Sequence, residues 1–186
     1  GVGVATYEAI GPERSYTLVA FAHNLPAEKR SDRVIAEAWD STFTLHDGTI
    51  SDADIERLRQ NVPLQVVGRI SDHEFVLSRG LRSVRLFDYV RDCLAAGPQP
   101  DPAMIEPVGY LMRTTAVYGS GKFGAADRDT WANRPEFLGS FQPELLAVWL
   151  IRSFTIDIVE HMASVKAPAK AVKLDPDIRR RIGVGN

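Results

Sequence analysis

Hydrophobic and polar residues alternate along two stretches near the start of the chain, residues 2–10 and 16–23. Alternation with a period of two is typical of a β-strand that buries one face. Residues 11–14, Gly-Pro-Glu-Arg, lie between the two stretches, and glycine and proline favour turns. The pattern therefore predicts an antiparallel β-hairpin.

Shorter patterns in the middle of the chain predict further extended segments. Residues 41–45 alternate as a strand does, and the Asp-Gly pair at 47–48 closes it. The apolar runs at 64–70 and 74–77 predict strands or extended linkers. Residues 26–39 are compatible with a short helix or with an irregular crossing, because a proline and charged residues open a partly helical stripe.

Three stretches carry helix signals. Ser51 and Asp54 form a capping box, which predicts a helix over 52–61 that ends before a proline. Residues 79–97 and 141–165 place apolar side chains at helical spacing, and the second stretch is the stronger pattern. Strands and helices do not alternate strictly, so the sequence predicts an α+β fold. We expect a mostly antiparallel sheet with helices packed on one face and a long C-terminal helix.

The chain of 186 residues suits one domain, and the proline-rich spacer 97–107 is a candidate subdomain boundary. The sequence has no initiating methionine and closes on a glycine-rich stretch after a basic cluster. These two features predict a segment of a longer polypeptide.

Composition narrows the classes of function. The formal net charge is −2, whereas a general nucleic-acid-binding protein is clearly basic, so we expect no nucleic-acid partner. One cysteine cannot form an internal disulfide or a cysteine-based zinc cluster. No apolar run is long enough to span a bilayer, so we expect no membrane partner. The composition predicts a soluble, cytoplasmic protein.

Residues 109–124 are the strongest candidate for a binding site. The segment begins as a run rich in β-branched and aromatic residues, which predicts a strand, and then breaks into glycines at 119, 121 and 124 around Lys122. Successive backbone N–H groups in a glycine turn can cradle an anion, and lysine supplies the opposite charge. The alternative is a glycine-rich turn with a solvated lysine.

Other cations favour the same ligand charge. Arg113 interrupts the predicted strand, where a buried charge needs a partner. Arg79 and Arg82 crowd the start of a predicted helix, where cations cost stability unless they meet an anion. Solvated arginines are the alternative. The candidate ligand-binding residues are Arg79, Arg82, Arg113, Tyr118, Gly119, Ser120, Gly121 and Lys122.

Three familiar motifs match this segment only in part. The glycine spacing fits the dinucleotide-binding pattern, but residues 125–130 are short and polar where an apolar helix is required. Phe123 stands where a phosphate loop needs serine or threonine. Tyr118 and Lys122 have the spacing of a dehydrogenase pair, but the glycines between them disfavour the helix it needs. The motifs therefore identify no family.

Residues 127–139 are polar, with Trp131 and Phe137 interspersed. A long segment without periodicity inside a compact domain is often a lid or a binding loop. The alternative is that the two aromatic residues attach this segment to the core.

Two residues are candidates for proton transfer. His23 lies at the end of a predicted strand, and Asp40 follows Trp39. A hydrogen-bonded histidine and a solvated carboxylate are the alternatives.

Two classes of function remain open. The first is an enzyme, or the substrate-binding domain of one, acting on an anionic small molecule such as a nucleotide, a phosphorylated metabolite or a carboxylate. The second is a non-catalytic module that provides an assembly surface, either in a homo-oligomer or against the remainder of a longer chain. The sequence identifies no cofactor and no metal ligands.

Overall fold

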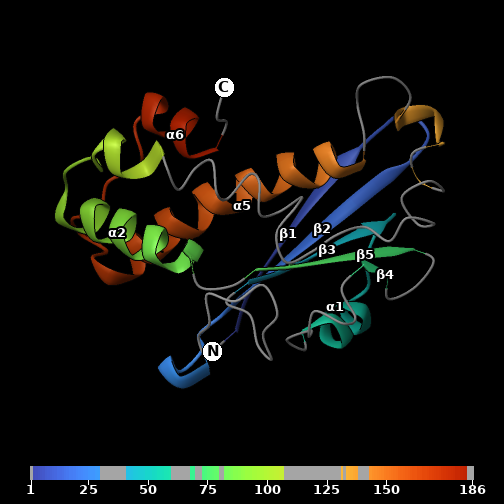
Figure 1. Cartoon of the computed structure of the whole chain (residues 1–186), viewed down its shortest axis with the longest axis horizontal. Helices are drawn as coiled ribbons and strands as arrows, with labels where there is room; N and C mark the ends of the chain where they lie inside the picture. Colours follow the sequence, from blue (N-terminus) through green and yellow to red (C-terminus); the bar gives the residue numbers. More distant parts are fainter. Residues whose placement is uncertain are drawn as a thin grey trace. The chain divides into compact units, whose positions relative to one another are not determined.

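The computed structural model describes residues 2–29, 41–59, 68–69, 73–79, 82–106, 131, 133–137 and 143–183, and all structural statements below concern these residues. The chain divides into two compact units, which we describe separately (Figure 1). The first comprises residues 1–81 and 115–151, and the second comprises residues 82–114 and 152–186.

The first unit is built on a five-stranded sheet with the strand order β1-β2-β3-β5-β4, in which every neighbouring pair is antiparallel (Figure 1). The predicted hairpin is confirmed, and Gly11 N–H donates to the carbonyl of Arg14 at 2.8 Å across its turn. The strands are β1 (Val2–Ile10), β2 (Ser15–His23), β3 (Ser41–Asp47), β4 (Gly68–Arg69) and β5 (Glu74–Arg79).

Strand β2 is buried along most of its length and has a paired strand on each side. Its side chains alternate between the two faces of the sheet. Val19 and Phe21 pack with the last residue of α1 (Asp52–Leu58) on one face. Tyr16 lies on the other face, where its ring contacts two aromatic rings from residues 131–137. Both faces of β2 are therefore covered by protein.

Helix α1 begins where the capping box predicts. The hydroxyl of Ser51 accepts a hydrogen bond from the backbone N–H of Asp54 at 3.2 Å, which satisfies one of the unpaired donors at a helix start. At the other end, the Arg59 N–H bonds to the carbonyl of Glu56 and so tightens the last turn.

The second unit is helical. It contains α2 (Arg82–Ala96), α6 (Pro176–Gly183) and, from residue 152 onward, the remainder of α5 (Pro143–Lys166). Short 3-10 turns η1 (Ala27–Lys29) and η3 (Pro135–Phe137) occur in the first unit. The α+β class and the long C-terminal helix are thus confirmed.

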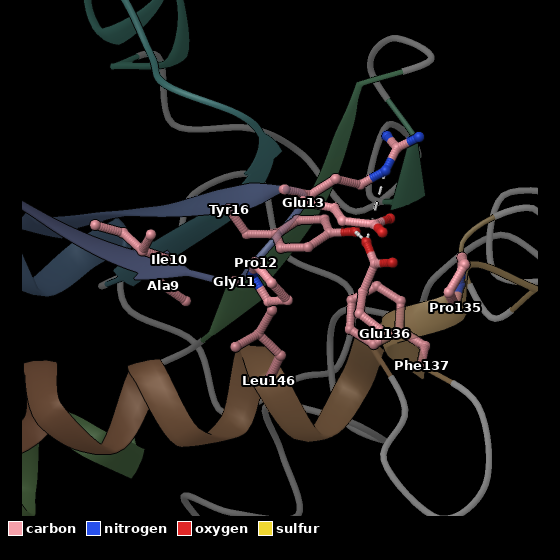
Figure 2. Close-up of a pocket in the computed structure, with 11 residues that line it drawn as sticks. Ala9, Ile10, Gly11, Pro12, Glu13, Tyr16, Pro135, Glu136, Phe137 and Leu146 are labelled. Carbon is pink, nitrogen blue, oxygen red and sulfur yellow. Dashed lines mark hydrogen bonds and ion pairs between the residues drawn. The ribbon is translucent and has the colours of Figure 1, made fainter.

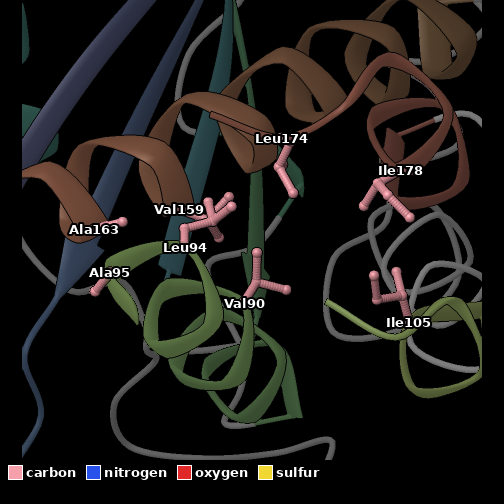
Figure 3. Close-up of a cluster of buried hydrophobic side chains, with 8 residues drawn as sticks. All are labelled: Val90, Leu94, Ala95, Ile105, Val159, Ala163, Leu174 and Ile178. Carbon is pink, nitrogen blue, oxygen red and sulfur yellow. The ribbon is translucent and has the colours of Figure 1, made fainter. Parts of the chain in front are cut away.

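The core of the second unit is formed mostly by apolar residues on the inner faces of its helices, together with Leu174 from the extended segment after α5 (Figure 3). Gly97 ends α2 with a φ of 108°, a conformation that glycine adopts without strain. The buried residues are Val90, Leu94, Ala95, Ile105, Val159, Ala163, Leu174 and Ile178.

Side chains also fasten the segment that follows α5. The amide of Gln99 donates to the carbonyl of Lys173 at 2.9 Å and accepts from the N–H of Asp175 at 3.0 Å. Between them, the Leu174 N–H donates to the carboxylate of Glu160 at 3.1 Å. An extended segment has no internal backbone partners, so these contacts satisfy its polar groups while Leu174 stays buried.

Two valines of α5 within the second unit allow a matched test of this core. Val159 is buried in the cluster, whereas Val165 is largely exposed. We expect Val159→Ala to lower the free energy of unfolding by about 2 kcal/mol, because it removes buried methyl groups and leaves a cavity. Val165→Ala should change it by less than about 0.5 kcal/mol. Chemical denaturation of both variants measures the difference, and equal effects would contradict the assigned core.

Candidate functional site

Tyr16 connects strand β2 to the turn η3. Its hydroxyl donates a hydrogen bond to Oε1 of Glu136 at 2.5 Å, and Arg134 donates one to the hydroxyl oxygen at 3.0 Å. Its ring centroid lies 5.2 Å from those of Trp131 and Phe137. A buried phenol needs apolar surroundings for its ring and a polar partner for its hydroxyl. This segment provides both.

Two arginines complete the network in different ways. Arg134 lies 2.8 Å from a carboxylate oxygen of Asp47, and its guanidinium is 4.4 Å from the centre of the Trp131 ring. Arg14 is 3.6 Å from Asp47 and 3.7 Å from Glu136, and its side chain is 49% exposed. Arg134 is therefore part of the framework, whereas Arg14 is held loosely enough to reorient toward a ligand.

The network moves the pKa values of Tyr16 and Glu136 in opposite directions. Burial, followed by the hydrogen bond to the Glu136 carboxylate, raises the pKa of Tyr16 to about 12. Burial alone would raise the pKa of Glu136, but the hydrogen bond from Tyr16 and the charges of Arg14 and Arg134 outweigh it and lower that pKa. At neutral pH the phenol is therefore a proton-bearing donor and the carboxylate is ionised.

A cavity of about 400 Å³ lies beside this network, between the β1–β2 turn, η3 and the first part of α5 (Figure 2). Its wall is mainly apolar, and its polar groups come from the network and the turn. This volume lies within the range of small-molecule pockets. The lining residues are Ala9, Ile10, Gly11, Pro12, Glu13, Arg14, Tyr16, Pro135, Glu136, Phe137 and Leu146.

The charges around this cavity do not favour an anion. Glu13, Asp47 and Glu136 provide three carboxylates. Arg14 and Arg134 provide two guanidinium groups. One net negative charge remains, so electrostatics favours a neutral or singly positive molecule at this site.

The pKa of Tyr16 has a consequence for stability. A tyrosine whose pKa is raised from 10 to about 12 by folding contributes stability that is complete below pH 10 and lost as the pH rises through 12. Wild-type protein should therefore lose more unfolding free energy between pH 10 and pH 12 than the Tyr16→Phe variant does. Denaturant titrations across this window measure it.

Glu136→Gln serves as the control for that titration, because it keeps the phenol but removes the charged acceptor. Its loss of stability in the same pH window should fall between those of the wild type and Tyr16→Phe. Identical pH profiles for all three proteins would show that folding does not raise the pKa of Tyr16.

A second polar cluster lies on the α1 side of the sheet. The carboxylate of Glu74 is only 1% exposed, and both terminal nitrogens of Arg57 bond to it. Nδ1 of His46 lies 3.4 Å from the same carboxylate and has no closer hydrogen-bond partner among the described residues. The side chain of Arg57 is 45% exposed, so the pair joins a buried anion to a hydrated cation.

This asymmetry predicts unequal effects of removing either partner. Arg57→Met leaves a buried carboxylate without its cation, and we expect a loss of about 3 kcal/mol of unfolding free energy. Glu74→Gln keeps an acceptor, and the half-exposed Arg57 can be hydrated, so we expect about 1 kcal/mol. Glu56→Gln, in an exposed pair at the end of the same helix, should have a smaller effect than either of these variants. Equal losses for Arg57→Met and Glu74→Gln would be inconsistent with the asymmetry.

His23 is the one predicted proton-transfer residue within the described part of the chain. It closes β2, and its Nε2 lies 3.1 Å from the hydroxyl of Thr42 on β3. Burial lowers its pKa, so the ring is neutral at pH 7. The ring is 6.2 Å from that of Phe21 and does not line the cavity. The structure thus places His23 in a hydrogen bond between two strands.

Most residues of the predicted anion site lie outside the described part of the chain. Arg79 is the last residue of β5 and Arg82 the first of α2, and only their backbone positions are described. The predictions for these two side chains therefore stay predictions, as do those for the remaining candidates. The candidates that lie outside the described residues are Asp40, Arg113, Tyr118, Gly119, Ser120, Gly121 and Lys122.

Sequence reasoning did not single out the residues around the cavity. Arg14 and Tyr16 read as parts of a turn and a strand, and Glu136 as part of a polar segment. The feature of the sequence that pointed to this region was the pair of aromatic residues, Trp131 and Phe137, in the polar segment 127–139. Both Trp131 and Phe137 are buried, which supports the alternative that they attach the segment to the core.

Comparisons with known proteins do not add to this picture: no family model, no curated protein and no solved structure matches the chain. Within the described ranges, no helix is long and apolar enough to cross a membrane. In the same part of the chain, no group of three or more His, Cys, Asp or Glu side chains is placed to hold a metal ion.

Proposed function

We propose that this protein binds a small molecule with an apolar body in the cavity beside Tyr16, and that the ligand is neutral or carries one positive charge. The observation that carries the proposal is the distribution of groups around the cavity. Apolar atoms form most of the wall, and the polar groups gather at Tyr16, Glu136 and Arg14. Small-molecule sites commonly combine such a wall with a few polar groups that orient the ligand.

The ionisation of the polar wall favours binding over proton transfer. An effective general acid or base has a pKa near the working pH. The pKa of Tyr16 is raised to about 12 and that of Glu136 is lowered, so neither group exchanges protons readily near neutrality. We therefore assign them to ligand orientation: a carboxylate can accept a hydrogen bond from an ammonium or hydroxyl group.

The sign of the ligand charge separates this proposal from the enzyme hypothesis raised by the sequence. The enzyme hypothesis places an anionic substrate on Lys122 and the glycine-rich loop. These residues lie outside the described part of the chain, so that hypothesis stays a separate prediction. We also propose a cytoplasmic location, on the basis of the composition.

A matched ligand series tests the proposal. It consists of an arylalkyl amine, the corresponding alcohol and the corresponding carboxylic acid, each titrated against the protein by calorimetry and by ligand-induced thermal stabilisation. We expect the amine to bind best, the alcohol next and the acid weakest. No binding by any of the three, or tightest binding by the acid, would overturn the proposal.

Two variants assign the binding to the cavity. Glu136→Gln should weaken amine binding by about tenfold, because it removes a charge-assisted interaction, while alcohol binding changes less. Glu8→Gln removes the same charge from β1 at a position that does not line the cavity, so it should leave both affinities unchanged. Equal effects of the two variants would place the ligand elsewhere.

A further inference from the structure

Strand β1 forms one edge of the sheet. It is nine residues long and pairs with β2 along its whole length, from Val2 opposite His23 to Ile10 opposite Ser15, without an inserted residue. No other strand in the described part of the chain pairs with it (Figure 1). The opposite edge strand, β4, has only two residues.

The alternation of hydrogen bonds shows which backbone groups of β1 face outward. Gly11 bonds to Arg14 at the end of the ladder, and in an antiparallel pair only every second residue bonds to the same neighbour. The odd-numbered residues of β1 therefore bond to β2. The even-numbered residues direct their N–H and C=O groups to the open side, and they are exposed: Val4, Thr6, Glu8 and Ile10.

The sequence and register of β1 lack the features that usually prevent strand pairing. Protected edges are short or carry lysine, proline or a bulge. Strand β1 contains neither lysine nor proline, its register is unbroken, and Glu8 is its only charged residue. Two of its outward positions are apolar, since Val4 is 44% exposed and Ile10 80% exposed. Such a strand can accept another strand through backbone hydrogen bonds.

We propose that the occupant of this edge is β1 of a second copy of the chain, paired antiparallel about a two-fold axis at Thr6. Thr6 is the midpoint of Val2–Ile10, so only this register pairs the full strand. Moving the centre to Ala5 or Tyr7 keeps the outward groups facing each other but shortens the overlap at both ends. A self-complementary edge is what a two-fold interface requires.

Charge is compatible with this register and disfavours one alternative. With Thr6 at the centre, Glu8 lies opposite Val4 of the second copy, so the two carboxylates do not face each other. Centring the pair on Glu8 would place like charges directly opposite, which is destabilising. The Thr6 register also sets Ile10, a cavity residue, beside the start of the second copy's strand. The dimer does not depend on the proposed ligand.

Charge variants at Val4 test the pairing and its register, with the dimer dissociation constant measured by sedimentation velocity on the full chain. Wild-type protein should approach twice the chain mass of 20.6 kDa as concentration rises. Val4→Glu should raise the dissociation constant by about tenfold, because two symmetric pairs of carboxylates then meet. Val4→Lys should leave it unchanged or lower it, and Glu8→Lys added to Val4→Glu should restore it.

A backbone variant tests the same edge independently of charge. Thr6→Pro removes an outward N–H and should abolish the dimer, whereas Thr6→Val keeps that N–H and should not. Circular dichroism and the melting temperature show whether the proline variant folds, and if it does not, the Val4 series decides. A monomeric wild type, or a dimer equally affected by Val4→Glu and Val4→Lys, would overturn the proposal.

Discussion

The hydroxyl of Tyr16 sets a constraint on which much of the first unit depends. The ring is buried against Trp131 and Phe137, so its hydroxyl must find a partner inside the protein. Glu136 supplies that partner, and Arg134 donates a second hydrogen bond to the hydroxyl oxygen. Tyr16 and Glu136 are 120 residues apart in the sequence. Their contact therefore attaches a distant segment of the chain to the sheet.

The same contacts define what the neighbouring cavity can do. Burial and the hydrogen bond to Glu136 keep the phenol protonated, whereas that hydrogen bond and the charges of Arg14 and Arg134 keep the carboxylate ionised, so both groups are suited to orienting a ligand. The loosely held Arg14 leaves one side of the network adjustable. Because carboxylates outnumber guanidinium groups there, the cavity differs in sign from the anion site that the glycine-rich loop predicts. The two predictions therefore concern different ligands.

The β1–β2 hairpin contributes both to the cavity and to the open edge of the sheet. Its turn forms one wall of the cavity, and its outer strand forms the open edge of the sheet. Ile10 belongs to both, since it lines the cavity and is 80% exposed. Pairing of β1 with β1 of a second copy would cover backbone groups near the cavity. It would not involve the polar groups of Tyr16, Glu136 and Arg14. Ligand binding and self-association can therefore be separated by mutation.

The amino-acid sequence by itself determined the local elements: the hairpin from its alternation, the start of α1 from Ser51 and Asp54, and the long helix from its apolar stripe. These features depend on neighbours in sequence, so their signals are local. Only the tertiary structure decided that Tyr16, Asp47 and Glu136 meet, and that Glu74 is buried beside Arg57. Those residues are far apart in the chain, and each alone looks like an ordinary surface side chain. Burial, which forces polar groups to find partners, arises only when the elements pack.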